Sequence, residues 1–335
     1  MVGGFGPIED LGAWRDRALS EIDGRQVVCS VSGGKDSTAM ALLLQEVDIP
    51  FISVHLDTGW EHPDTDRYVR DYLPTVIGPI DIVQREQGGM AELVLQQAGF
   101  PGGNQRFCTR ELKILPMRRF LDGLDAEPIN TVGIRSGESA RRAEMPVWDT
   151  SAALGCAVWR PLKAFSEADV YAMHRRHSVE MNPLYALGCS RVGCWPCVFA
   201  RKSEIKLLSE IDPERLALIR HLENQVQKQR ERRNIARGRR TNTPPTWFVH
   251  KLATWSIDEV IGWARSELGA GGFRAALSET DPELTIKERI ATLQPEPFDA
   301  PPHEQGCMRW GLCELPSTEE SSMDEFDRMW QLAGD

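Results

Sequence analysis

The chain has 335 residues, of which 41% are hydrophobic and 26% are charged, and its formal net charge is −10. This length allows about two domains with a sizeable core, and the acidic balance argues against a protein that is basic throughout. No apolar run approaches the ~18 residues of a membrane span, and the first residues lack the pattern of a signal peptide, so we expect a cytoplasmic protein without a membrane partner. Eight cysteines in such a chain indicate metal or redox chemistry, or buried side chains, rather than a secreted disulfide scaffold.

Residues 1–24 are expected to form a lead-in helix, and the stretch after them is the most informative part of the chain. Residues 27–38 read VVCSVSGGKDST, which predicts a short buried strand, a glycine turn and the start of a helix. This arrangement points backbone N–H groups and the positive end of a helix at an anion. A Walker A loop is excluded, because Cys29 stands at the early glycine position and Asp36 follows Lys35. The candidate phosphate-binding residues are Ser32, Gly33, Gly34, Lys35, Asp36 and Ser37.

The second predicted strand, residues 51–56, runs directly into Asp57, Thr58 and Gly59. Open α/β sheets bind ligands outside the carboxyl ends of their strands, so Asp57 and Gly59 are candidate nucleotide-binding residues. The structural alternative for Asp57 is a capping role in the turn between strand and helix. Residues 87–105 are glycine-rich at both ends and predict a lid or an insertion.

Arginines gather after the predicted strand at residues 129–134. Guanidinium groups suit bidentate contacts with phosphate or sulfate, whereas the alternative is a solvated, basic helix start. The candidate nucleotide-binding residues of this part, together with one at the end of a later strand, are Gly133, Arg135, Arg141, Arg142 and Arg160.

Strands and helices alternate over residues 25–200. This pattern predicts an α/β nucleotide-binding domain with a parallel sheet covered by helices on both faces. The pattern becomes helical over residues 201–293, and residues 294–335 form a proline-rich and then acidic extension.

A loop at residues 188–197 holds three cysteines within nine residues. The Cys194-x-x-Cys197 spacing lets two thiolates converge on one centre, and Cys189 is close enough to join them. Cys108 is distant in sequence but is expected near the strand ends, which makes it the fourth candidate metal ligand. Four thiolates suit a 4Fe–4S cluster or a structural zinc, and the spacing alone does not separate the two.

The string Ser-Gly-Gly-Lys-Asp-Ser at residues 32–37 resembles the PP-loop of the ATP pyrophosphatase superfamily, which includes the phosphoadenylylsulfate (PAPS) and adenylylsulfate (APS) reductases. The Asp-Thr-Gly-x-Glu-x-x-x-Thr string from Asp57 and the segment 106–113 are also similar to these reductases. The resemblance implies an adenine nucleotide as ligand, ATP, APS or PAPS, with Lys113 helping to neutralise it as a catalytic residue. It also implies a 4Fe–4S cluster rather than zinc. The iron–sulfur branch uses a Cys-Cys pair where this chain has Cys108-Thr109, and Cys189 is the natural substitute.

The resemblance breaks near the C-terminus, where reductases carry Glu-Cys-Gly-Ile/Leu-His. This chain has Cys307 and Cys313 there without that motif. In a reductase, one of these thiols would attack the sulfonyl sulfur, with a thioredoxin-like protein or a ferredoxin as electron donor. In an adenylating enzyme, Asp36 or Asp57 would position Mg²⁺ and pyrophosphate would leave. Both chemistries remain open.

A basic run lies between Lys228 and Arg240, with seven positive residues and Glu231 as the single negative one. On a helix it predicts a stripe that follows phosphates of DNA or tRNA, in keeping with sulfur insertion into a nucleic acid. The alternative is a solvated helix end, where cations are favoured near the C-terminus.

Overall fold

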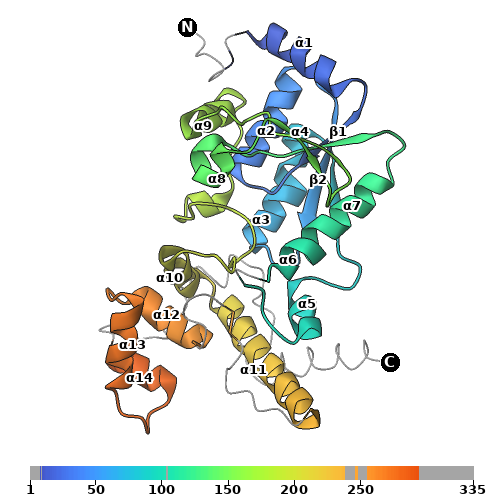
Figure 1. The fold of residues 1–335 in the computed structure, drawn as a ribbon. Coiled ribbons are helices and arrows are strands. Elements are labelled where there is room, and N and C mark those ends of the chain that lie inside the picture. The colour runs from blue at the N-terminus through green and yellow to red at the C-terminus, as the bar shows by residue number, and fades with distance from the viewer. Residues whose placement is uncertain (1–7, 9, 103–104, 238–245, 248–254, 294–335) are drawn as a thin grey trace.

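The computed structural model describes residues 8, 10–102, 105–237, 246–247 and 255–293 (Figure 1). A six-stranded sheet with the order β3-β2-β1-β4-β6-β5 forms its centre. The strands are β1 (Gln26–Ser30), β2 (Phe51–Asp57), β3 (Ile80–Gln84), β4 (Pro128–Thr131), β5 (Trp148–Ser151) and β6 (Cys156–Trp159). Every pair is parallel except β5 with β6, so the expected parallel α/β sheet is confirmed with one antiparallel edge strand added. That edge strand was not predicted; it is antiparallel because a short turn joins it directly to β6.

The order of the strands creates a switch point beside β1. The chain runs outward from β1 through β2 to β3, and the next strand, β4, pairs with the other side of β1. The register sets Cys29 opposite Thr131, so β1 and β4 end at nearly the same level. Ligands of open α/β sheets bind outside the carboxyl ends of strands at such a point. The glycine loop after β1 and the arginine segment after β4 therefore face the same space.

Helices cover both faces of the sheet, as expected (Figure 1). On one face, Val27 and Cys29 of β1 belong to a buried cluster with side chains of α1 (Leu11–Ile22), α2 (Lys35–Glu46) and α9 (Glu167–Arg176). On the other face, Val28 packs in a cluster with Met117 and Leu121 of α7 (Leu115–Asp122). The alternation of side chains along a strand explains why neighbouring residues of β1 serve opposite faces.

The helical C-terminal region lies below the sheet domain in Figure 1. A third buried core, separate from the two clusters on the faces of the sheet, joins this region to the sheet domain. It includes buried side chains of α10 (Lys202–Ile211), α11 (Pro213–Ala236), α12 (Ile257–Arg265), α13 (Ala270–Ser278) and α14 (Ile286–Thr292). Trp60, just after β2, belongs to the same core and stacks on Trp247 with ring centroids 4.7 Å apart. The stretch expected to be a lid contains the helix α5 (Met90–Gln97), whose Leu93 and Val94 are buried in this core.

Several helices begin where the sequence has a capping signal. Ser166 caps α9 in a reciprocal pair with Asp169, and Asp212 caps α11 just before Pro213. None of the helices in the described residues is long and apolar enough to cross a membrane. The remaining helical segments are α3 (Pro63–Arg67), π-helical η1 (Tyr68–Tyr72), α4 (Pro74–Ile77), α6 (Phe107–Thr109), π-helical η2 (Arg110–Ile114), 3₁₀-helical η3 (Ser136–Glu138), α8 (Ala140–Ala143) and 3₁₀-helical η4 (Pro183–Tyr185).

Candidate functional site

The loop between β1 and α2 contains two glycines with different structural needs. Gly33 has φ +73°, and a Cβ placed on it would lie 2.8 Å from Cγ2 of Val69, so the fold itself requires glycine there. Gly34 caps α2 with an extended backbone that any residue can adopt, and a Cβ on it would meet nothing closer than Oγ of Ser32 at 3.4 Å. The fold therefore does not explain Gly34.

Hydroxyl oxygens accept hydrogen bonds from three backbone N–H groups of this loop. Ser32 N–H donates to Oγ of Ser37 at 3.1 Å, Gly34 N–H to Oγ of Ser32 at 3.4 Å, and Lys35 N–H to Oη of Tyr185 at 3.0 Å. These three amides are thus paired with hydroxyl oxygens of the protein. The same donors suit the oxygens of a phosphate, which binds at helix N-termini through backbone N–H groups.

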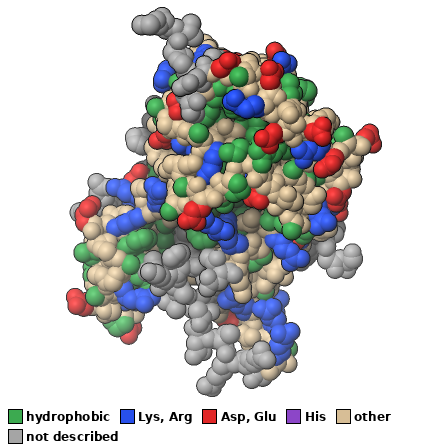
Figure 2. All heavy atoms as spheres, turned by 45° about the horizontal axis from the view of Figure 1, so that its top comes forward, with side chains coloured by type: hydrophobic (Ala, Val, Ile, Leu, Met, Phe, Trp, Pro, Cys, Tyr) green, Lys and Arg blue, Asp and Glu red, His purple; other side chains and the backbone are tan. Residues whose placement is uncertain are grey.

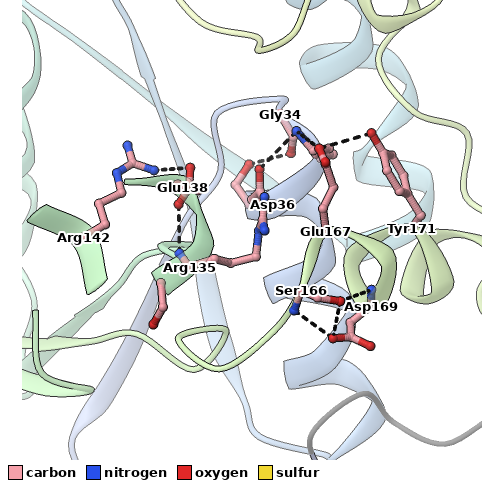
Figure 3. Close-up of polar contacts among 12 residues, drawn as sticks. Gly34, Asp36, Arg135, Glu138, Arg142, Ser166, Glu167, Asp169 and Tyr171 are labelled. Carbon is pink, nitrogen blue, oxygen red and sulfur yellow. Dashed lines mark hydrogen bonds and ion pairs between the residues drawn. The ribbon is translucent and has the colours of Figure 1, made fainter. Parts of the chain in front are cut away.

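Charged side chains from three elements meet beside the loop (Figure 3). Nε of Arg135, which follows β4, donates to Oδ1 of Asp36 in the first turn of α2. Nζ of Lys35 lies 3.7 Å from Oδ2 of Asp36 and 3.3 Å from Oε1 of Glu167, the first residue of α9. The hydrogen bond and the charge of Lys35 lower the pKa of Glu167. Both cations are nearly fully buried, so an anion bound here would find them already in place.

Gly133 explains how β4 and α2 come so close. A Cβ on Gly133 would lie 2.8 Å from the backbone oxygen of Asp36, so only glycine permits this approach. The structure therefore brings Gly133 and Arg135 to the phosphate loop, as expected from the sequence.

The other three candidate arginines have local partners or face solvent. Arg160 donates to the backbone oxygen of Pro146 at 2.9 Å and to Asp149 at 3.1 Å, which braces the β5–β6 hairpin. Arg142 pairs with Glu138, and Arg141 is exposed on the short helix α8. Their role as nucleotide ligands stays a prediction.

Asp57 has partners for both of its carboxylate oxygens. Oδ1 accepts the N–H of Gly59 at 2.8 Å, and Oδ2 accepts from the guanidinium of Arg70 at 2.6 Å. Gly59 itself has φ +62° and lies against Gly89, which fits a tight turn. These contacts hold the turn after β2, but the capping alternative stated for Asp57 is wrong, because His62 is the N-cap of α3. The catalytic role of Asp57 remains a prediction.

Thiols gather around Lys113 near the end of β2. Lys113 lies in the π-helical turn η2, directly after α6, which carries Cys108. The pKa of Lys113 is raised, with Cys194 as the largest cause, followed by the carboxylate of Glu61 and then by Cys197 and Cys108, while burial opposes the shift. Burial raises the pKa of the Cys108 and Cys194 thiols, and the Lys113 ammonium opposes that effect. Three of the four candidate thiols are therefore within electrostatic reach of one cation.

The cysteine loop is tied to the end of β2 by backbone and side-chain contacts. Trp195 N–H donates to the backbone oxygen of Trp60 at 2.7 Å, and Nε1 of Trp60 donates to the backbone oxygen of Pro196 at 3.2 Å. Oγ1 of Thr58 lies 3.7 Å from Sγ of Cys194. These contacts position Cys194 above the sheet edge that also carries the phosphate loop.

The described residues do not form a closed metal site. No group of three or more His, Cys, Asp or Glu side chains in them is placed to hold a metal ion. Cys189 is buried, and the charge that acts on its thiol is that of Glu204 rather than Lys113. As placed, the four thiols do not match a four-thiolate cage. Cys307 and Cys313 lie outside the described residues, so their roles stay predictions.

Several residues of the site had no signal in the sequence. Tyr185 reaches Lys35 across 150 residues, Nδ2 of Asn182 donates to the Gly33 oxygen at 3.2 Å, and a ring nitrogen of His174 lies 2.9 Å from the Lys35 oxygen. These contacts fix the loop from α9 and η4. Asn182-Pro183 was visible as a turn signal, but its partner was not.

Comparison with known proteins shows which family the chain belongs to. Residues 26–200 match the family described as the phosphoadenosine phosphosulfate reductase domain, and the chain belongs to this family. It is 34% identical over 254 residues to an uncharacterized 37.8 kDa protein of Escherichia phage 186, covering 59% of this chain and 75% of that one. It is 28% identical over 190 residues to an adenosine 5'-phosphosulfate reductase of Allochromatium vinosum, covering 52% and 68%.

Among solved structures, the PAPS reductase of Candida auris in a phosphate complex is similar over 55% of this chain and 88% of its own, with 18% identity and a TM-score of 0.44. The family match confirms the expected resemblance to the PAPS and APS reductases. It also confirms the expectation that the chain belongs to a family of enzymes.

Proposed function

We propose that the chain binds an adenine sulfonucleotide, APS or PAPS, at the loop after β1 and reduces its sulfonyl group. The observation that supports this most is the meeting of the α2 N-terminus with Arg135 and Lys35 at the switch point of the sheet. Loop amides would hold the phosphate, and the buried cations would balance its charge. The names of the relatives and of the family point to the same ligand class.

The proposed reduction is a two-step transfer. A thiolate attacks the sulfonyl sulfur, the bond from sulfur to the phosphate oxygen breaks, and the adenosine phosphate leaves with that electron pair. A second thiol then attacks the S-sulfonated cysteine, which releases sulfite and leaves a disulfide. A thioredoxin-like or ferredoxin donor supplies the two electrons that reduce the disulfide. Cys307 or Cys313 is the proposed nucleophile.

A 4Fe–4S cluster belongs to the proposal and rests on three thiols: those of Cys108, Cys194 and Cys197 beside Lys113. The cluster would add negative charge that this ammonium offsets; Cys189 is the weakest of the four proposed ligands because its thiol lies nearer Glu204. Anaerobically purified protein should be brown, with broad absorbance near ~400 nm from iron–sulfur charge transfer and bound iron and sulfide. Cys194→Ser should remove colour and iron, whereas Cys29→Ser, at a buried thiol of the sheet core, should keep both. Colourless wild-type protein with one zinc would refute the iron assignment.

A second candidate is an ATP pyrophosphatase that adenylates a nucleic acid or small molecule for sulfur insertion. The observation that favours it is the basic end of α11 in an acidic chain, which suits DNA or tRNA. Asp36 or Asp57 would then position Mg²⁺, the substrate would attack the α-phosphate, and pyrophosphate would leave.

The two candidates release different products. The protein, reduced and anaerobic, is incubated with PAPS or APS and a dithiol, and separately with ATP, Mg²⁺ and nucleic acid. Sulfite from the first mixture supports reduction, and pyrophosphate from the second supports adenylation. Protein that binds none of the three nucleotides would refute both.

A further inference from the structure

A cavity of about 330 Å³ lies between the C-terminal end of α5 and the last turns of α11, away from the phosphate loop. Ala98, Gly99, Phe107, Arg230 and Arg233 are among its lining residues. Its volume is in the range of small-ligand sites. The proposed nucleotide chemistry at the loop after β1 makes no use of it.

The guanidinium group of Arg230 is held in the wall of the cavity by a hydrogen bond. Nε of Arg230 donates to the backbone oxygen of Ala98 at 2.8 Å, which uses one of the five donors of the side chain. A Cβ on Gly99 would lie 2.8 Å from Nη2 of Arg230, so only glycine at this position leaves space for the guanidinium group. Arg230 is thus held in place by α5, with further N–H groups left for a ligand.

Among the residues that the structure describes, no carboxylate balances the positive charge in the cavity. Burial lowers the pKa of Arg230, and the charge of Arg233 lowers it further. In the described part of the chain, neither arginine has an ion pair with Asp or Glu. An anion between the two groups would relieve both the repulsion and the burial cost.

The positive charge continues along the exposed end of α11. Figure 2 shows Lys and Arg side chains gathered at this end of the molecule, and Lys228, Arg232 and Arg237 are exposed there. At 3.6 residues per turn, Arg237 lies on the same side of α11 as Arg230 and Arg233, about 10 Å beyond Arg230, whereas Lys228 and Arg232 lie on the opposite side. In a chain with net charge −10, such a local stripe suits a polyanion.

Two apolar side chains interrupt this positive surface. Phe107 lines the cavity itself, and Ile235 on α11 is 81% exposed. Sites for single-stranded nucleic acid combine a positive groove with an aromatic ring on which a base stacks. Binding of an acidic peptide would not require an aromatic ring, and a duplex is too wide to enter the cavity.

We propose that this cavity seats one nucleotide of a single-stranded DNA or RNA, with its phosphate on Arg230 and Arg233 and its base against Phe107. Arg237, on the same side of α11, contacts a flanking phosphate. Since Phe107 is followed directly by Cys108, the seated nucleotide lies next to the thiols around Lys113. This proposal does not depend on whether the loop after β1 binds a sulfonucleotide or ATP.

The test is fluorescence anisotropy of the full chain with labelled single-stranded DNA and RNA oligonucleotides over a range of salt concentrations. For single strands the logarithm of affinity falls with the logarithm of salt at about −0.7 per phosphate contact. Arg230→Gln with Arg233→Gln removes two contacts, so the slope should flatten by about 1.4 and affinity at ~0.1 M salt should fall about 25-fold. Phe107→Ala should weaken binding about tenfold at every salt concentration and leave the slope unchanged.

The matched control is Arg118→Gln with Arg119→Gln, two exposed arginines on α7 that each pair with a surface carboxylate. It removes the same charge and should leave affinity and slope unchanged. If loss of Arg230 disturbs α5, the single variant Arg233→Gln, at an exposed side chain, replaces the double variant. The slope of log affinity against log salt should then flatten by about 0.7. A preference for RNA over DNA, or the reverse, identifies the natural strand.

Three outcomes would overturn the proposal. One is wild-type protein without salt-sensitive binding to either strand. Another is equal loss in the cavity variant and the α7 control, and the third is full displacement of the oligonucleotide by polyglutamate at equal charge. Nucleotide binding at the loop after β1, measured with PAPS and ATP on the same variants, should stay unchanged; this separates failure here from failure of the proposed function.

Discussion

Gly33 and Gly34 offer a direct test of the phosphate loop, because they are adjacent and the structure assigns them different roles. At Gly34 an added Cβ stays 3.4 Å or more from its neighbours, so Gly34→Ala should leave the free energy of unfolding nearly unchanged. That Cβ lies 3.5 Å from Oη of Tyr185, on the side where hydroxyl oxygens accept from loop amides. A phosphate oxygen would be displaced from that side.

The expected loss at Gly34 follows from the hydrogen bonds at stake. A hydrogen bond to a charged group contributes about 1.5–3 kcal/mol, so displacement from two amides should cost about 3 kcal/mol or more. At about 1.4 kcal/mol per factor of ten, the Kd of the adenine nucleotide should rise at least ~100-fold. Gly33→Ala should behave differently, since φ +73° alone costs about 1–2 kcal/mol and the Cβ also meets Val69.

The assay combines calorimetric titration with ATP, APS and PAPS and a thermal melt of each variant. Gly34→Ala should lose binding with Tm within ~1 °C of the wild type, and Gly33→Ala should lower Tm by about 5 °C or more. Undiminished nucleotide affinity in Gly34→Ala would refute the loop assignment, whatever the melt shows. A large fall in its Tm would refute the steric reasoning.

Two further predictions concern buried charges. Burial raises the pKa of Glu223, which accepts from Trp247 and Ile257 N–H groups, to about 7. Because this folded pKa lies above the unfolded value, Glu223 contributes roughly 3 kcal/mol to the free energy of unfolding below about pH 4.5, and this contribution is lost as pH rises through about 7. Urea titrations of the wild type should show this fall. The same fall in Glu223→Gln would contradict the prediction. Arg135→Gln should weaken nucleotide binding and lower Tm, since it removes the hydrogen-bonded partner of Asp36 and leaves only Lys35 beside that carboxylate. Adding Asp36→Asn should restore Tm but not binding, and restored binding would show that Arg135 only neutralises Asp36.

Local signals in the sequence were enough to predict the glycine loop between β1 and α2 and most of the sheet domain. A β-branched run, two glycines and strong helix formers specify the β1–α2 unit through contacts within a few residues. Ser166 with Asp169, and Asp212 with Pro213, likewise specify helix starts locally. Alternation of such units is sufficient for a parallel α/β sheet, because parallel strands need helical crossovers.

The parts that could not be predicted depend on contacts between distant segments. Nothing near Tyr185 indicates that its hydroxyl accepts from Lys35, because that contact needs η4 to pack over the loop. The separation of Cys189 from the other thiols is equally hidden, although it is only five residues from Cys194. The contact between Trp60 and Pro196 helps to place Cys194 near Lys113. The spacing of residues in the sequence does not indicate this contact.

The phosphate loop and the thiols are held by the same two segments of the chain. After β2, Thr58 lies against the Cys194 sulfur, and seven residues later Oγ1 of Thr65 accepts from Asn182, which also donates to the Gly33 oxygen. The segment that starts at Asn182 continues through Tyr185 to the cysteine loop. A shift of the loop on nucleotide binding must therefore move residues that are continuous with those around Cys194. The proposed sulfur chemistry would use this arrangement, because an electrophile made or held at the nucleotide has to meet a nucleophilic sulfur before water does.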